Sequence, residues 1–230
     1  MRNLVSRRCA LSVFTATYFG EAAMLLHFKK LILIDPGIVD EKPLVTRNII
    51  HPSCVLVTHS HRENLGNAAS FAIGGGSLIL SNAQVIDELR RQGAQGFALE
   101  RLADGKTFDT RVQVTITAHE LSHGGMLAPR NTAFMIKSAE GKILHLGHAR
   151  EYEELSGRRP DLLCVPVAGK RRGTLDPQGA AEATAAIRPR YVLPTSGDAR
   201  QVEEFLTQVA QRAASSVTVT PRTGEPFTIG

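Results

Sequence analysis

Two histidines one residue apart are the strongest chemical signal in the chain. His59 and His61 directly follow a mostly apolar run, Ser53–Thr58, and a helical pattern begins at Asn64. A buried strand that leads into two such histidines and then into a helix can point both imidazoles into one pocket. Neutral imidazole is a common ligand for zinc, and a third ligand from elsewhere completes a usable site. The motif therefore predicts a metal site at the end of this strand.

The rest of the chain alternates short apolar runs with amphipathic stretches. Strands are expected over residues 11–18, 22–28, 30–34, 53–58, 77–80, 112–118, 131–137, 142–146, 161–167, 191–193 and 216–220. Helices are expected over 64–71, 81–92, 176–187 and 198–213, with a capping box from Ser81 to Gln84 and with Asp176 and Asp198 as N-caps. Because strands and helices interleave throughout, we expect one domain over residues 1–230, with a sheet core and outer helices.

Composition and charge narrow the class of protein. Apolar residues make up 43% of the chain and charged residues 21%, which is typical of a folded globular protein. The net charge of +5 permits anionic ligands, but aromatic residues are only 5% and no long basic stripe is present, so we do not expect nucleic-acid binding.

The expected location is the cytoplasm. No apolar run is long enough to cross a bilayer, and the N-terminal segment does not fit a signal peptide. Cys9, Cys54 and Cys164 are odd in number and widely spaced, which favours reduced thiols. The sequence gives no direct signal for oligomeric state and is compatible with a homo-oligomer.

The histidine motif also resembles a known family. Residues 58–64, Thr-His-Ser-His-Arg-Glu-Asn, are similar to the Thr-His-x-His-x-Asp-His signature of metallo-β-lactamase-fold hydrolases. The resemblance runs from about residue 12 to the C-terminus, and it is strongest to the branch typified by ascorbate-6-phosphate lactonase. Further matches in the same order are Ile34-Asp35-Pro36, 112–119, 143–148, Pro166, 174–177 with Ala180, and Gly224-Glu225. It implies a four-layer αββα sandwich of two mixed sheets flanked by helices.

The resemblance also implies a metal-binding set. One ion would be held by His59, His61 and a remote histidine at a strand end, which matches His119. His123, four residues later, is expected to be an ordinary loop histidine, with substitution for His119 after a loop shift as the alternative. We expect one divalent metal ion, zinc first, with manganese or iron as alternatives.

The second metal site of the family has lost most of its ligands here. The corresponding positions carry Glu63, Asn64, His148 and Ser196, and an early Gly-His is replaced by Gly20-Glu21. An amide and a neutral hydroxyl are poor zinc ligands, so a two-metal site is not expected. His148 could be a fourth ligand of the remaining ion, it could hydrogen-bond a metal-bound water, or it could only pack in the cavity. Glu63 is the candidate general base or orienting residue.

The resemblance suggests the type of reaction. We expect a hydrolase of an ester, lactone or phosphoester, with a metal-bound hydroxide as nucleophile. Arg62 and the basic residues Lys170, Arg171 and Arg172 could contact an anionic small-molecule substrate. A solvated loop is the favoured interpretation of the last three, and Arg62 could instead only pair with Glu63. The alternative is a non-catalytic protein of this fold that binds a small anionic ligand or a protein partner in the old cleft. Asp35 could orient a ligand histidine, or it could only form a turn.

Overall fold

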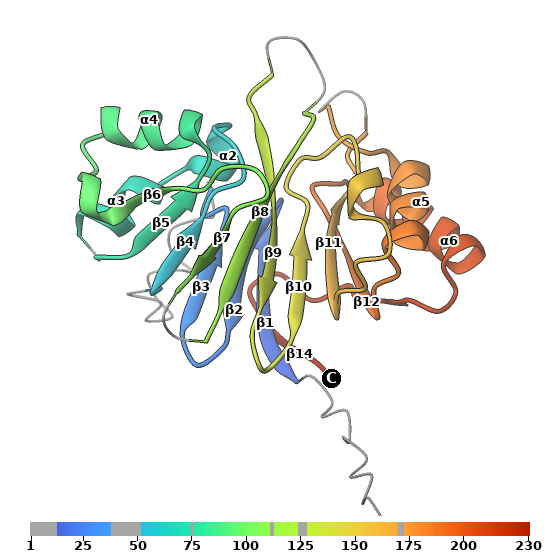
Figure 1. The fold of residues 1–230 in the computed structure, drawn as a ribbon. Coiled ribbons are helices and arrows are strands. Elements are labelled where there is room, and N and C mark those ends of the chain that lie inside the picture. Colours follow the sequence, from blue (N-terminus) through green and yellow to red (C-terminus); the bar gives the residue numbers. More distant parts are fainter. Residues whose placement is uncertain (1–12, 38–51, 75, 111–112, 124–127, 170–172) are drawn as a thin grey trace, which may run out of the picture.

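Two sheets lie together at the centre of the molecule, and helices flank them on both sides (Figure 1). The computed structural model describes residues 13–37, 52–74, 76–110, 113–123, 128–169 and 173–230. Within these residues each sheet has seven strands. Every helix in the described part of the chain is too short or too polar to span a bilayer.

Sheet A holds the N-terminal strands and the C-terminal strand. Its order is β14-β1-β2-β3-β4-β5-β6, antiparallel from β14 to β3 and parallel from β3 to β6. Its strands are β1 (Phe14–Gly20), β2 (Ala23–His27), β3 (Leu31–Ile34), β4 (Cys54–Leu56), β5 (Leu78–Ser81), β6 (Leu99–Arg101) and β14 (Pro226–Ile229).

Sheet B is built from the second half of the chain. Its order is β13-β12-β11-β10-β9-β8-β7, parallel from β13 to β10 and antiparallel from β10 to β7. Its strands are β7 (Thr107–Asp109), β8 (Thr115–Leu121), β9 (Asn131–Lys137), β10 (Lys142–His145), β11 (Leu162–Pro166), β12 (Tyr191–Thr195) and β13 (Val217–Thr218). Both sheets are mixed, as the resemblance implied.

The core divides into three apolar clusters that define the layers. The central cluster joins the sheets, because it contains Leu26 of sheet A together with Ile116 and Phe134 of sheet B. The outer face of sheet A packs against α2 (Arg62–Leu65), α3 (Ala68–Ile73), α4 (Ala83–Arg91) and the short 3₁₀ helix η1 (Gly96–Ala98). The outer face of sheet B packs against α5 (Pro177–Ile187), α6 (Ala199–Arg212) and η2 (Glu153–Leu155). This arrangement confirms the expected αββα sandwich.

The helix ends show which capping predictions hold. Asp176 accepts a hydrogen bond from the Gly179 backbone N–H at the start of α5, and Asp198 forms a capping box at the start of α6. The capping box at Ser81 was wrong. Ser81 ends β5 and donates to the Val57 carbonyl oxygen, while Asn82 caps α4 by accepting from the Val85 N–H.

The helix expected over residues 64–71 is two short helices instead. Gly66 ends α2 with a φ of 39°, and a Cβ atom there would lie 2.2 Å from the Gly37 carbonyl oxygen. The chain turns at this point because two backbone segments approach too closely for a side chain. Strands β6, β7 and β14 were not predicted from the sequence; they are short and lie at the edges of the sheets.

Candidate metal centre

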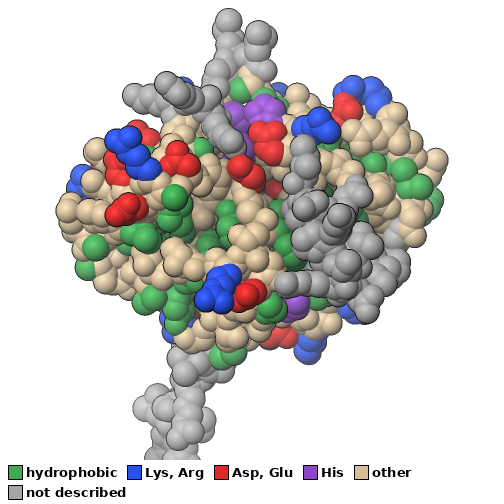
Figure 2. Space-filling view, turned by 180° about the vertical axis from the view of Figure 1, so that it is seen from behind, with side chains coloured by type: hydrophobic (Ala, Val, Ile, Leu, Met, Phe, Trp, Pro, Cys, Tyr) green, Lys and Arg blue, Asp and Glu red, His purple; other side chains and the backbone are tan. Residues whose placement is uncertain are grey.

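Four histidines converge at the edge of the sheets where the parallel strands of sheet A end. One ligand nitrogen from each of His59, His61, His123 and His148 lies within 4.8 Å of the others. They follow β4 of sheet A and, in sheet B, β8 and β10, the two strands that flank β9. A space-filling view shows histidine side chains reaching the surface at one end of the molecule, beside carboxylates (Figure 2).

Three of these imidazoles are evenly spaced, and the fourth stands to one side. The ring centroids of His59, His61 and His123 are 4.8, 4.9 and 5.0 Å apart. The centroid of His148 is 4.6 Å from that of His59, but 5.8 and 6.5 Å from those of His123 and His61. The geometry therefore separates a compact three-histidine set from a flanking histidine.

The orientation of His59 is fixed through Thr58. The Thr58 hydroxyl donates to Asp35 Oδ2 at 2.7 Å, so it accepts from Nδ1–H of His59 at 2.9 Å. That assignment puts the proton of His59 on Nδ1 and leaves Nε2 as the ligand atom. His59 Nε2 lies 3.1 Å from His61 Nδ1, close to the separation of about 3.3 Å between two nitrogen ligands of a tetrahedral zinc ion.

Asp35 holds the loop of Thr58 and the helix residue Asn64 together through hydrogen bonds. It is fully buried, and it accepts hydrogen bonds from the Thr58 N–H, the Thr58 hydroxyl and the Asn64 amide. Burial raises the pKa of Asp35 to about 7, and the hydrogen bonds from Thr58 and Asn64 oppose that rise. Asp35 thus acts on a histidine indirectly, through Thr58.

Glu63 stands at the mouth of the cluster. His61 precedes α2 as its N-cap, and Glu63 Oε1 lies 4.0 Å from His61 Nδ1 in a side chain that is 39% exposed. Burial and the neighbouring His61 lower the pKa of His123, while the charge of Glu63 opposes that shift. The negative charge of Glu63 therefore favours positive charge at the cluster, and Glu63 lies on the side of the cluster that faces solvent.

His123 is the strongest sign that the cluster binds an ion. It is 8% exposed, and neither ring nitrogen has a hydrogen-bond partner among the described residues. A buried imidazole without a partner costs free energy that ligation of a metal ion removes. Burial, followed by the neighbouring histidines, also lowers the pKa of His59 far below its usual value. Both rings are thus kept neutral, which metal ligation requires. The donor set fits a zinc-type divalent ion.

His148 is held by one backbone and one side-chain hydrogen bond. Its backbone N–H donates to Asn131 Oδ1, and its Nε2 lies 3.0 Å from Ser196 Oγ. Gly147 allows the close approach to the His59 loop, because a Cβ there would lie 2.7 Å from Thr58 Cβ. Nε2 of the ring thus faces Ser196.

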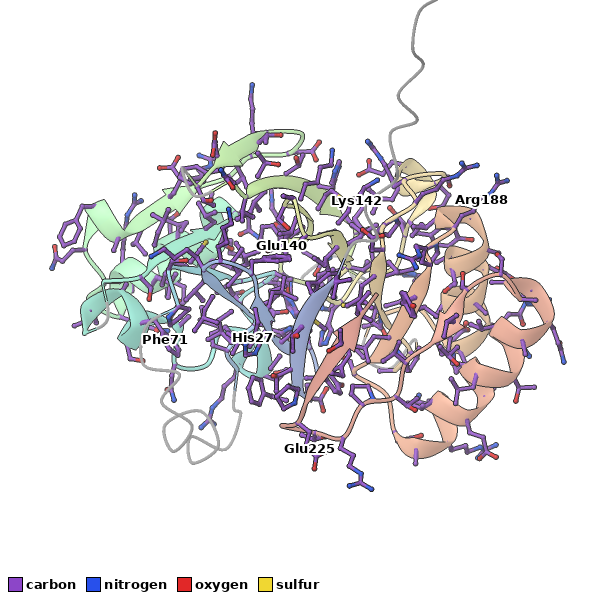
Figure 3. The ribbon with its side chains drawn as sticks, turned by 90° about the horizontal axis from the view of Figure 1, so that it is seen from below. His27, Phe71, Glu140, Lys142, Arg188 and Glu225 are labelled. Carbon is purple, nitrogen blue, oxygen red and sulfur yellow. The ribbon has the colours of Figure 1, made fainter. Side chains whose placement is uncertain are left out.

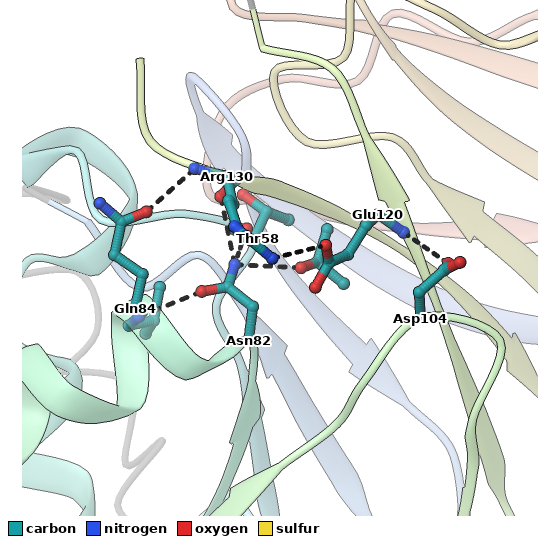
Figure 4. A network of polar contacts seen from close by, with 8 residues as sticks. Thr58, Asn82, Gln84, Asp104, Glu120 and Arg130 are labelled. Carbon is teal, nitrogen blue, oxygen red and sulfur yellow. Dashed lines mark hydrogen bonds and ion pairs between the residues drawn. The ribbon is translucent and has the colours of Figure 1, made fainter. Parts of the chain in front are cut away.

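A polar network ties the two sheets together beside the cluster (Figure 4). The side-chain amide of Asn82 donates to the Thr58 and Arg130 carbonyl oxygens and to Thr132 Oγ1. Arg130 pairs with Glu120 at 3.1 Å, and its N–H donates to Gln84. The loop that carries His59 is therefore anchored to the β8–β9 hairpin that carries His123.

The structure does not bring His119 into this cluster. His119 pairs with Ala133 of β9, and Ala133 belongs to the apolar cluster between sheet B and its outer helices. The neighbouring Ala118 belongs to the central cluster between the two sheets, so His119 lies on the outer face of sheet B. His119 instead groups with Asp104 and Glu154. The strand was expected to end at His119 but continues to Leu121. The alternation of Ile116 and Ala118 was the sequence signal that placed His119 on the opposite face.

The remaining candidates divide between surface, core and undescribed residues. Arg62 is exposed on α2, and Lys170, Arg171 and Arg172 lie outside the described residues. His145 is fully buried and lies 3.0 Å from the Ala22 carbonyl oxygen, so it joins the two sheets. His27 ends β2 beside Thr17, and Figure 3 labels it in the view from below.

Known proteins share both the sequence pattern and the fold. Residues 15–196 match the family described as beta-lactamase superfamily domain. A UPF0173 metal-dependent hydrolase of Thermoplasma acidophilum is 26% identical over 182 residues, covering 77% of this chain and 80% of that protein. A UPF0173 metal-dependent hydrolase of Methanosphaera stadtmanae is also 26% identical, over 91% of this chain and 97% of its own length.

Solved structures agree on the fold. Igni18, a metallo hydrolase from Ignicoccus hospitalis, superposes with a TM-score of 0.78 at 20% identity, covering 95% of this chain and 99% of its own. The metallo-beta-lactamase fold protein YhfI from Bacillus subtilis gives a TM-score of 0.75 at 13% identity, over 93% and 99%. From the family match and the shared architecture, the chain belongs to the β-lactamase superfamily and has the metallo-β-lactamase fold.

Proposed function

We propose that this chain is a metal-dependent hydrolase that holds one divalent ion with His59, His61 and His123. The near-equal spacing of these three rings carries the proposal, together with the unpartnered nitrogens of His123. Three protein ligands with a further coordination position left over are typical of catalytic zinc sites, whereas four protein ligands are typical of structural ones. His123 thus takes the place that the sequence analysis gave to His119.

The proposal assigns one ion because the residues at the second-site positions have other partners. Asn64 donates to Asp35 at 2.8 Å, and Ser196 lies 3.0 Å from His148. Asn64 and Ser196 thus support residues around the three-histidine site and are engaged in these contacts. The names of the relatives, which describe metal-dependent hydrolases, support hydrolysis as the reaction class.

Two side chains are positioned to move protons. The chemistry that a zinc-type ion supplies in such a site is activation of water and polarisation of the scissile bond. Glu63, on the solvent side of His61, accepts the proton of the attacking water at Oε1. His148, oriented by Ser196, donates a proton to the leaving group.

The substrate in this proposal is a small ester, lactone or phosphoester, with an anionic group favoured. A groove of about 300 Å³ beside His123, lined by residues 120–123 and 128–131, accommodates the part of the substrate away from the reacting bond. Arg130 lines this groove and Arg62 is exposed beside Glu63, so both are candidates to contact an anion.

Metal content and turnover of matched variants test the proposal. Purified protein is analysed for zinc, manganese and iron, and then assayed on generic ester and phosphodiester substrates after metal loading. His123→Ala should lose the tightly bound ion and the turnover, while His119→Ala should keep the tightly bound ion. Retained ion and turnover in His123→Ala would contradict the ligand assignment. A tightly bound ion without turnover on any substrate would favour the non-catalytic alternative, a protein that binds an anionic ligand or a partner in this cleft.

A further inference from the structure

A second group of potential metal ligands lies on the outer side of sheet B. One ligand atom from each of Asp104, His119 and Glu154 lies within 4.8 Å of the others. The three come from the turn between β6 and β7, from β8 and from η2. We propose that these side chains bind a divalent cation of the zinc type, and that this cation fastens the segments that carry His123 and His148.

The state of His119 is the first argument. The residue is 9% exposed, and its ring makes no hydrogen bond within the described part of the chain. Its nearest polar contact is Glu154 Oε1, 3.7 Å from Nδ1, which is too long for a hydrogen bond. That distance approaches the separation of about 3.3 Å expected between two ligands of one zinc ion. A histidine and a carboxylate at this separation can both be ligands of one divalent cation.

The two carboxylates complete a ligand set of mixed type. Asp104 Oδ1 accepts the Glu120 N–H at 2.9 Å, which fixes the carboxylate beside β8 without using Oδ2. Glu154 is 53% exposed and can adjust towards an ion. Histidine and carboxylate together suit zinc and manganese.

Nearby cations set the expected strength of this site. Burial is the main cause that lowers the pKa of His119; Arg158 and Lys137 add to it, while Glu154 and Asp104 oppose them. The positive charges of Arg158 and Lys137 partly cancel the attraction of the two carboxylates for a cation. We therefore expect this site to bind zinc less tightly than the three-histidine cluster.

The position of the site gives it a structural role. His119 lies four residues before His123, and Glu154 lies six residues after His148. The same two segments are already joined by the hydrogen bond from the Arg150 N–H to the Ser122 carbonyl oxygen, at 2.9 Å. A cation between His119 and Glu154 adds a second link, so it would hold both cluster histidines in register.

Zinc titration of the chelator-treated full chain tests this inference. Wild type should bind two zinc ions per chain, one tightly and one more weakly. Glu154→Gln and Asp104→Asn should each weaken the second binding event at least tenfold without changing the first. Asp104→Asn keeps an oxygen for the Glu120 N–H, and both residues are exposed, so folding should persist and circular dichroism checks it.

Two controls separate this site from the histidine cluster. Glu153→Gln changes the neighbouring carboxylate of η2, which accepts from the Tyr152 N–H, and should leave both binding events unchanged. His61→Ala should lose the tight event and keep the weak one. The inference is overturned if Glu154→Gln and Asp104→Asn titrate like wild type, or if His61→Ala abolishes all zinc binding.

Discussion

The Thr58 hydroxyl donates a 2.7 Å hydrogen bond to the Asp35 carboxylate, and this bond decides which nitrogen of the next residue faces the cluster. A hydroxyl has one proton to give, so its oxygen is left to accept from His59 Nδ1–H. A buried carboxylate thereby controls a histidine that it does not touch. Such outer contacts raise the basicity of a ligand and fix its direction.

Removing the Thr58 hydroxyl should weaken metal binding. Thr58→Val keeps the shape but deletes both the bond to Asp35 and the acceptor for His59. Loss of such an orienting contact typically lowers metal affinity about 10- to 100-fold. Competition with a chromophoric chelator measures the change. Thr58→Ser keeps the hydroxyl, so its metal affinity should remain close to that of wild type. Equal affinity in wild type, Thr58→Ser and Thr58→Val would contradict a role of the Thr58 hydroxyl in orienting His59.

Glu63→Gln tests proton transfer separately from metal binding. The carboxylate is 4.0 Å from His61 Nδ1, so the amide keeps the size of the side chain but cannot accept a proton. We expect kcat to fall about 10²- to 10⁴-fold with unchanged metal content. A variant that retains full turnover would remove Glu63 from the reaction, whereas a loss of the ion would make it a ligand.

Close packing of the loops should make Gly147 intolerant of a side chain. It has a φ of 60°, and a Cβ there would lie 2.4 Å from Asn131 Oδ1. Gly157 has a similar φ of 71° with nothing within 4 Å of a Cβ, so it is the matched control for backbone strain alone. We expect Gly157→Ala to cost about 1–2 kcal/mol and Gly147→Ala to cost about 1–3 kcal/mol more. Urea unfolding measures both free energies, and equal losses would contradict the packing argument.

His145 should make stability depend on pH. Burial lowers its pKa from 6.5 to about 4, although the contact with the Ala22 carbonyl opposes the shift. Nδ1 accepts the Gly147 N–H, so protonation of the ring would break that bond. As the pH falls, the unfolded chain binds a proton at His145 at a higher pH than the folded chain does. The contribution of His145 to the free energy of unfolding is therefore complete above about pH 6.5 and is lost as the pH falls towards 4. It amounts to about 3 kcal/mol at most.

Urea unfolding of chelator-treated protein between pH 7 and pH 4 measures this dependence. His145→Gln should be less stable at pH 7 and should lose part of the slope that wild type shows. His27→Gln is the control, since His27 is only half-buried at the far end of β2. A slope that His145→Gln leaves unchanged would mean that other groups account for the pH dependence.

The fold could be predicted largely because its signals are local or ordered along the chain. Asp176 followed by Pro177, and Asp198 with Gln201, each define a helix start from neighbouring residues alone. The break at Gly66 could not be predicted this way. It results from contact with Gly37, a residue nearly thirty positions away, which only the folded chain brings close.

The site shows the same division between local and distant information. The pair His59 and His61 is visible as a motif, and the expectation that they lie together is confirmed by the geometry. The choice between His119 and His123 depends on how far β8 continues, which its pairing with β9 decides. His119 lies within β8 on the outer face of sheet B, whereas His123, four residues later, lies beyond the end of the strand and joins the cluster.

Anomalous diffraction at the zinc edge, from crystals of the zinc-loaded protein, identifies the ligands of the bound ion. We expect a strong peak bonded at about 2.0–2.1 Å to nitrogens of His59, His61 and His123, with His148 beside it and hydrogen-bonded to Ser196. A peak bonded to all four histidines, or to His119 in place of His123, would contradict this assignment.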